Sequence, residues 1–328
     1  MIGFGVQRTA AWRVGALASR APLRLWPAAV GPRTGLLHTT AAARAGGQPA
    51  GNTAVAPADP TLPGLTLTFF QKAKGYLAFY KQGVKALWQN GKAAGGIRQR
   101  LKDGSQVTRA EFQIHQRHPG DRLRLVPFGL LLVVFPEIIP LLAALFPKAC
   151  PSTCVTYAQV VKMAAKQDAR RQALHRQALQ RIEAAGLGPS DFATVAALQK
   201  AVARGNALFA LDGLDGADLR LLCGFMGAGG PAAGLRTEWL RGGLRQHLEK
   251  LAADDALLAG EKLVARLGPV ELHRACQERG IPSAHIPEPR LRQALGGWVD
   301  LTQTSRTSIG MLPIAWSRLV LLSAAVKQ

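Results

Sequence analysis

Apolar and polar positions along this chain recur with the period of an α-helix over most of its length. From residue 65 to residue 90, apolar and aromatic side chains return every three or four positions, and lysines occupy the positions between them. This spacing predicts an amphipathic helix ended by the glycines at 91, 95 and 96, with a second helix over residues 108–118. Residues 65–122 are thus expected to form a basic helical region, which suits either an anionic membrane surface or packing against the rest of the protein.

The pattern changes at residue 125, because the next residues up to 146 are apolar except for Glu137. About 20 such residues are needed to cross a bilayer, and this run has basic residues at both ends. We therefore expect a single transmembrane helix over residues 123–147. The competing interpretation is a long buried helix of a soluble protein.

Glu137 lies near the middle of this segment, with Pro136 beside it and Pro140 three residues on. A carboxylate near the bilayer centre costs at least ~2.5 kcal/mol, so it must be protonated, paired, or facing protein or water. The two prolines leave nearby carbonyls without helical partners, and such carbonyls beside an acid could coordinate a cation. Either these three residues handle a cation or proton, which requires an oligomer, or they form a hinge where Glu137 meets a basic residue.

The N-terminal region has the composition of a targeting segment. Residues 1–45 contain arginines at positions 8, 13, 20, 24, 33 and 44, and the first acid of the chain is Asp59. Arginine-rich, acid-poor sequences with interspersed apolar residues are typical of mitochondrial transit peptides. Residues 46–64, rich in Gly, Pro and Ala, are expected to be a flexible spacer.

Residues 148–328 show helical periodicity interrupted by Gly, Pro, Ser and Asp, and strand alternation is almost absent. We expect an all-α protein in which one transmembrane helix precedes a C-terminal bundle of short helices. The last apolar segment, residues 309–326, contains Pro313 and Arg318, which favours a helix that closes the bundle over a second span. The expected helices cover residues 157–185, 192–204, 215–226, 235–251, 254–267, 270–279 and 287–301.

Residues 268–301 predict two short helices joined by an extended loop. Pro269 suits a first helical turn, Gly280 suits a C-terminal cap, and each helix has one apolar face. The arginines are expected on the outside, where they could bind the phosphates of a nucleic acid. The candidate ribosome or nucleic-acid contacts are Arg274, Arg279, Arg290 and Arg292.

The overall charge of +21, from 41 basic and 20 acidic residues, favours anionic partners. No grouping of acid, histidine and nucleophile suggests an enzyme. The four cysteines do not form a disulfide framework, and no glycine-rich loop, zinc site or EF-hand spacing indicates a cofactor or metal.

Two blocks of the sequence resemble the LETM family. The first is "LRLVPFGLLLVVFPEIIPLLAALFPKACPST", and the second combines "DDALLAGEKLVARLGPVELHRACQERGI" with "RLRQALGGWVDL". The resemblance covers roughly residues 110–325. It implies a single-pass protein of the mitochondrial inner membrane whose C-terminal, ribosome-binding domain faces the matrix.

The family is also linked to potassium/proton or calcium/proton exchange, and Glu137 aligns with its membrane glutamate. This sequence lacks the coiled coil and EF-hand extension of longer members, and proline directly precedes Glu137. We therefore expect mitochondrial ribosomes and inner-membrane lipids as partners, with support of membrane-protein insertion, respiratory-chain assembly and ion homeostasis as the role. The alternative is an oligomeric K⁺ or Ca²⁺/proton exchanger that uses Glu137.

Overall fold

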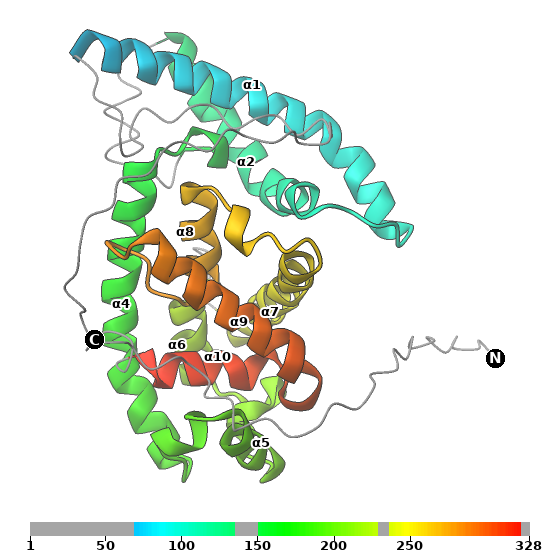
Figure 1. Ribbon diagram of the computed structural model, residues 1–328, viewed down its shortest axis with the longest axis vertical. Coiled ribbons are helices and arrows are strands. Elements are labelled where there is room, and N and C mark those ends of the chain that lie inside the picture. The colour runs from blue at the N-terminus through cyan, green and yellow to red at the C-terminus, as the bar shows by residue number, and fades with distance from the viewer. Residues whose placement is uncertain (1–68, 135–149, 229–235, 323–328) are drawn as a thin grey trace, which may run out of the picture.

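The computed structural model describes residues 69–134, 150–228 and 236–322, and all regular elements in these ranges are helices (Figure 1). This confirms the predicted all-α class. Several predictions fall outside the described residues: the transit peptide at 1–45, the spacer at 46–64, and the segment with Glu137, Pro136 and Pro140.

The first two helices form a hairpin, α1 (Phe69–Lys102) and α2 (Arg109–Val134), which crosses one end of the molecule (Figure 1). The prediction that the glycines at 91, 95 and 96 end the first helix is wrong. Each glycine costs roughly 1 kcal/mol relative to alanine. However, Ala94, which lies between the glycines, and Ile97, which follows them, are both buried, and their packing stabilises the helix.

Helix α2 also runs farther than predicted, because it passes through Pro119 and Pro127 without ending. Its side chains before and after Pro119, Arg117 and Asp121, bind groups of other elements and fix the helix on both sides of the proline. Residues 123–134 of the predicted span are the C-terminal turns of α2. Among the described helices, none combines the length and the apolar character that crossing a bilayer requires.

The rest of the described chain forms a helical bundle in which most of the predicted helices are present. The predicted break near residue 252 is wrong, because the buried side chains of Leu251, Asp254 and Leu258 continue one face through it. The predicted helix at 192–204 begins later, where Thr194 caps it. The elements are η2 (Ser152–Cys154), α4 (Tyr157–Ala184), η3 (Pro189–Phe192), α5 (Val195–Ala203), η4 (Ala207–Phe209), η5 (Leu211–Gly213), α6 (Gly216–Met226), α7 (Thr237–Gly260), η6 (Val264–Arg266), α8 (Pro269–Glu278), α9 (Glu288–Ile309) and α10 (Met311–Val320).

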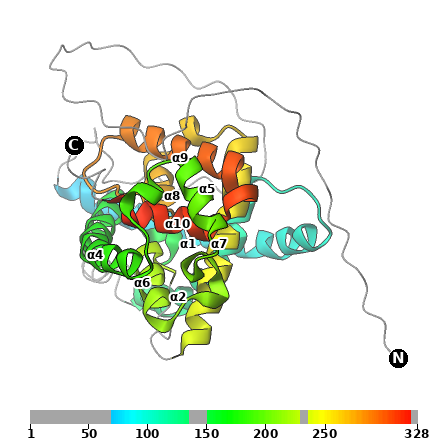
Figure 2. The same cartoon turned by 90° about the horizontal axis from the view of Figure 1, so that it is seen from below.

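Helix α10 lies at the centre of the bundle, surrounded by α4, α5, α6 and α9 (Figure 2). Its Trp316 is completely buried, as are Trp298 of α9 and Phe225 of α6. Truncating a buried tryptophan costs about 3–5 kcal/mol, so these side chains dominate the core. The preference for a bundle helix over a second span at this segment is confirmed for residues 311–320.

A second, smaller apolar cluster joins the hairpin to the start of α4. Gly83 of α1 allows the close approach, since a Cβ there would lie 2.7 Å from Cys154 Sγ and 2.8 Å from the Thr153 carbonyl oxygen. Thr153 Oγ1 in turn donates to the Gly83 carbonyl at 2.8 Å. The buried members of this cluster are Phe79, Tyr80, Phe128, Cys150, Cys154, Val155 and Val160.

Candidate functional site

The predicted helix–loop–helix is present as α8, a loop at residues 279–287, and α9. Gly280 has φ +71°, and the Ile281 N–H donates to the Cys276 carbonyl at 2.9 Å, which ends α8 as predicted. The loop is held by Asp168 of α4, whose carboxylate accepts from Ser283 N and Ala284 N. The unit is therefore a fixed frame on which exposed side chains have defined positions.

The sequence predicted Arg279 on the outside of the bundle, and this prediction is wrong. Its side chain is completely buried. Its guanidinium donates to Asp254 at 2.7 Å, to Asp255 at 2.8 Å and to the Ala275 carbonyl at 2.9 Å. Two buried carboxylates require a cation beside them, which is the physical reason for this position. Arg279 is a structural residue of the bundle.

Two further predicted contact residues, Arg274 and Arg292, donate hydrogen bonds to backbone carbonyls of neighbouring segments. Arg274 donates to the Ser152 carbonyl at 2.7 Å and to Glu271 at 3.2 Å. Arg292 donates to the Leu267 carbonyl at 2.9 Å and to Glu288 at 2.8 Å. Both side chains stay partly exposed, at 19% and 28%, so each can still offer part of its charge to a partner.

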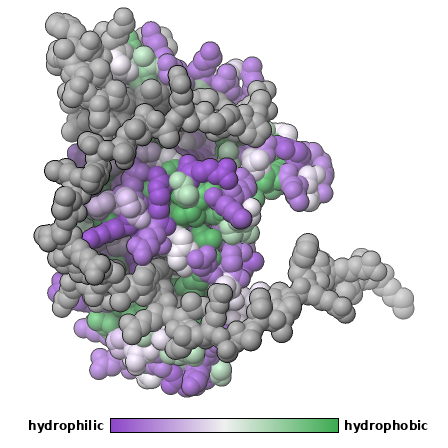
Figure 3. Space-filling model, in the orientation of Figure 1, coloured by the Kyte–Doolittle hydropathy of each residue, from purple (hydrophilic) through white to green (hydrophobic). Residues whose placement is uncertain are grey.

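Arg290 is exposed as predicted, and the structure adds two cations that the sequence reasoning missed. Lys262 and Arg266 are exposed on the turn before α8. Arg292 of α9 donates to the Val264 carbonyl in this turn and so holds the turn beside the start of α9. The face that carries α9 is mixed, with hydrophilic residues around a smaller apolar area (Figure 3). We name Lys262, Arg266 and Arg290 the exposed basic set.

Helix α2 packs on α7 and α8 through a row of polar side chains, which we call the polar stripe. Arg109, Gln113, Arg117 and Asp121 are spaced four residues apart, so all four lie on one side of the helix. Arg109 and Gln113 both donate to Asp254, at 2.9 and 2.7 Å. This four-residue repeat was visible in the sequence and could have predicted the docking face.

Two more contacts extend the junction toward the apolar end of α2. Arg117 donates two hydrogen bonds of 2.8 Å to Glu271 of α8, and Asp121 accepts from Ser152 N at 2.8 Å. Because Arg274 also binds Ser152 and Glu271, α8 holds both α2 and η2. The junction ties the segment that precedes residue 135 to the predicted contact unit.

The buried acids of this junction differ in their electrostatics. Burial acts to raise the pKa of Asp254, but Arg279 and Arg109 outweigh it and lower that pKa below its ordinary value. The pKa of Asp255 is raised, because the effect of burial is larger than the opposing effects of the Arg279 charge and the hydrogen bond from Trp298. For Glu271, Arg117 and Arg274 outweigh burial and lower the pKa. Asp254 and Glu271 are therefore held as charged partners of arginines.

Within the residues that the structure covers, no group of three His, Cys, Asp or Glu side chains is placed to hold a metal ion. The four cysteines are buried thiols, and burial raises the pKa of Cys154 to about 12. The arrangement is thus one of fixed helices, a buried Arg–Asp cluster and exposed cations.

The sequence is similar to that of mitochondrial proteins. Residues 193–320 match the family described as "LETM1-like, RBD". The mitochondrial proton/calcium exchanger protein of Drosophila melanogaster is 28% identical over 267 residues, which are 74% of this chain and 26% of the fly protein. The LETM1 domain-containing protein mdm28, mitochondrial, of Schizosaccharomyces pombe is 25% identical over 260 residues, 71% of this chain and 53% of the yeast protein. No solved structure matches the chain.

The regular elements of the described residues are all helices, and the matched relatives are mitochondrial proteins. Residues 193–320 are similar to the LETM1-like family, and the two relatives extend the similarity to most of the chain. It spans about a quarter of the fly relative and about half of the yeast relative.

Proposed function

We propose that this chain is a mitochondrial inner-membrane protein that docks mitochondrial ribosomes through its basic helical bundle. In this proposal residues 123–147 attach the chain to the membrane from one side, because the hydrogen bond from Ser152 N to Asp121 at 2.8 Å holds the two ends of this segment together. The predicted single crossing is incompatible with this contact, since a bilayer core is about 30 Å thick. The bundle faces the matrix in this proposal, and the chain is not an enzyme. Docking would support insertion of membrane proteins, assembly of the respiratory chain and ion homeostasis. The match of residues 193–320 to the family whose description includes "RBD" carries the proposal.

The exposed basic set gives the proposal a physical basis. Ribosomal RNA presents phosphates, and lysine and arginine side chains bind them with an affinity that depends on salt. The frame beneath these side chains is rigid, since Arg292 and Asp168 fix the segments on either side of Arg290. A fixed frame reduces the ordering cost of binding, which favours docking at this surface.

The test is salt-graded co-sedimentation of the full chain, in detergent micelles, with mitochondrial ribosomes. The variant Lys262→Glu/Arg266→Glu/Arg290→Glu should weaken binding and lower the salt slope by roughly 0.7–0.9 for each phosphate that the chain no longer neutralises. Arg274 and Arg279 are left intact, because changing them would disturb the fold rather than the surface.

A matched control reverses three exposed cations elsewhere on the bundle, Arg176, Lys200 and Arg220. This control changes the net charge by the same amount and should retain the wild-type salt slope. Equal sedimentation of wild type and the Lys262/Arg266/Arg290 variant at every salt concentration would exclude docking through the exposed basic set.

Exchange of K⁺ or Ca²⁺ for protons by an oligomer is the second candidate function. The observation that favours it is the name of the fly relative, a proton/calcium exchanger. The carrier in this proposal is Glu137, with Pro136 and Pro140 shaping the carbonyls beside it. Glu137→Gln should abolish ion flux into vesicles that contain the purified chain and leave ribosome sedimentation unchanged. Unchanged flux in that variant would exclude Glu137 as the carrier.

A further inference from the structure

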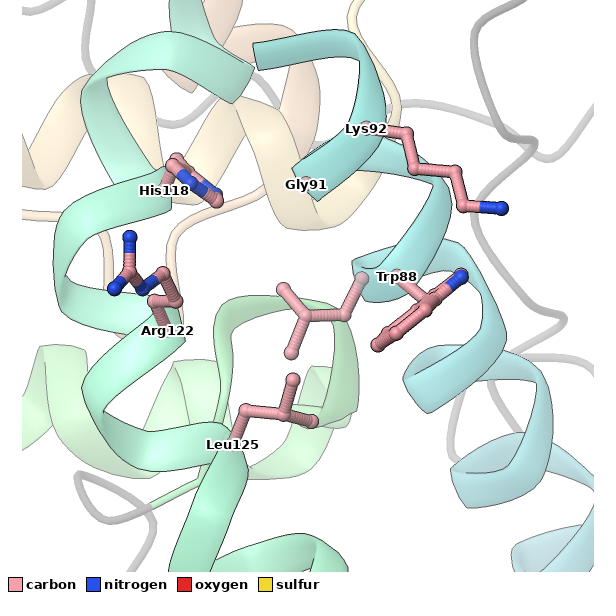
Figure 4. Close-up of a pocket in the computed structure, with 7 residues that line it drawn as sticks. Trp88, Gly91, Lys92, His118, Arg122 and Leu125 are labelled. Carbon is pink, nitrogen blue, oxygen red and sulfur yellow. The ribbon is translucent and has the colours of Figure 1, made fainter. Parts of the chain in front are cut away.

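A cavity of about 300 Å³ lies between α1 and α2, beside the residues that lead into the apolar segment. Figure 4 shows Trp88, Gly91 and Lys92 on α1 and His118, Arg122 and Leu125 on α2. The His118 and Leu125 side chains point toward the gap between the helices, whereas the Lys92 amine and the Arg122 guanidinium point away from it. Leu87 completes the lining. The volume is at the lower end of the usual range for ligand pockets, roughly 300–1,000 Å³.

Gly91 provides the space for this cavity. A Cβ at Gly91 would lie 3.5 Å from His118 Cε1, so a larger side chain there would extend into the gap between the helices. In Figure 4 the Arg122 and His118 side chains lie on the α2 side of this gap. Lys92 extends the other way, with its amine 5.7 Å from the centre of the Trp88 ring.

The polar part of the lining has one sign of charge. Arg122 and Lys92 are cations, His118 can donate a hydrogen bond, and no acidic residue lines the cavity. In the described part of the chain, no carboxylate forms an ion pair with Arg122 or Lys92, whereas Arg100, Arg109 and Arg117 each have one. A ligand with a phosphate group would supply an anion to these cations.

The surroundings favour a lipid over free phosphate. Leu87, Leu125 and Trp88 form an apolar wall, and Leu123, Leu130 and Val134 are exposed along the same end of α2. Exposed apolar residues beside a basic site allow acyl chains to cover the helix while the phosphate binds Arg122.

We infer that this cavity binds the phosphate group of an anionic phospholipid, with Arg122 and His118 at the phosphate and Leu87, Leu125 and Trp88 against the glycerol and first chain carbons. Arg122 and Lys92, whose charged ends point away from the gap in Figure 4, would each reach the phosphate from the mouth of the cavity by a change of rotamer. The inference rests on the membrane location in the proposed function, and it does not depend on ribosome docking.

Native mass spectrometry of the detergent-purified full chain, titrated with phosphatidylglycerol, tests this site. The wild type should retain one phosphatidylglycerol. Gly91→Leu fills the cavity and should weaken retention at least tenfold by excluding the lipid. Arg122→Gln removes the cation proposed to bind the phosphate and should weaken retention about tenfold, as expected for one lost charge-assisted hydrogen bond. Gly95→Leu and Arg98→Gln are matched controls at exposed positions of α1, and both should bind as the wild type does.

Two further arms identify the ligand. Phosphatidylcholine should be retained at least tenfold less than phosphatidylglycerol, and inorganic phosphate should not displace the lipid at equal concentration. Equal binding by wild type and Gly91→Leu would overturn the site, and displacement by inorganic phosphate at equal concentration would overturn the lipid as its ligand. Ribosome sedimentation of Gly91→Leu should equal that of the wild type, so failure of docking and failure of this site are separate results.

Discussion

The hairpin and the bundle differ in where they place their apolar side chains. In the bundle, Trp298, Trp316 and the leucines around them are buried. Five of the six exposed large apolar side chains that the structure describes belong instead to the hairpin: Leu77, Trp88, Leu123, Leu130 and Val134, with Trp239 the exception. The hairpin thus keeps an apolar surface that the bundle does not cover.

The way in which the two regions meet explains this difference. Helix α2 faces the bundle with its polar stripe, through Arg109 to Asp254 and Arg117 to Glu271. A polar junction fixes the orientation of the helix by specific partners while it leaves the apolar residues of the other side unused. The hairpin therefore keeps exposed apolar side chains although a polar junction fixes it to the bundle.

The largest expected effect follows from removing the cation at the centre of the buried cluster. Arg279→Met leaves Asp254 and Asp255 without it, and breaking a buried pair in this way costs roughly 3–5 kcal/mol. Thermal unfolding of the full chain in detergent, followed by circular dichroism, should show a strongly lowered midpoint. Arg290→Met, the same substitution at an exposed arginine of the next helix, should leave the midpoint unchanged. Equal midpoints for the two variants would contradict a structural role for Arg279.

A smaller and more local effect is expected at Gly83, where α1 approaches η2. Gly83→Ala places a Cβ within 3 Å of Cys154 Sγ and the Thr153 carbonyl oxygen, and overpacking of this kind costs about 1–3 kcal/mol. Hydrogen exchange should increase in α1 and remain unchanged in α9. Gly95→Ala, where nothing lies within 4 Å, should not increase exchange in α1. Increased exchange throughout the bundle in Gly83→Ala would show that the two regions unfold as one unit.

The fold class and most bundle helices could be predicted from the sequence, because apolar periodicity and the signals at Pro269 and Gly280 are local. The interior of the site could not, since burial of Arg279 depends on Asp254 and Asp255, which belong to another helix. The glycines of α1 misled the prediction for a similar reason. Their helix-breaking tendency is local, and the packing of Ala94 and Ile97 that overrides it is not.

The junction between the two regions should weaken in acid. The Arg117–Glu271 pair lowers the pKa of Glu271 below its ordinary value of 4.5, so the folded chain binds this proton less tightly than the unfolded chain. The stabilisation from this pair is complete above a pH of about 4.5, and it is lost as the pH falls through the lower pKa that Glu271 has in the folded chain. Because both side chains are partly exposed, the loss should be about 1 kcal/mol.

Hydrogen exchange of α2 between neutral and acidic pH measures this loss. Glu271→Gln removes the titrating carboxylate, and its α2 should exchange faster at neutral pH with a flatter dependence on acid. Asp254, with its lowered pKa, also loses stability in acid, so the difference between variant and wild type isolates Glu271. An identical pH dependence in both would exclude this pair as the acid-sensitive contact.

Thiol labelling gives the finest comparison of the two regions and requires no change in stability. Burial raises the pKa of Cys150 to about 11 and that of Cys154 to about 12 in the small cluster, with Cys223 at about 11 and Cys276 at about 12 in the bundle. The thiolate is the reactive form, so at neutral pH each cysteine should react only when its region opens. The small cluster has fewer buried neighbours, so Cys150 and Cys154 should be alkylated before Cys223 and Cys276, as peptide mass analysis over time would show. Gly83→Ala should widen that interval, and simultaneous labelling of all four would mean that hairpin and bundle share one opening.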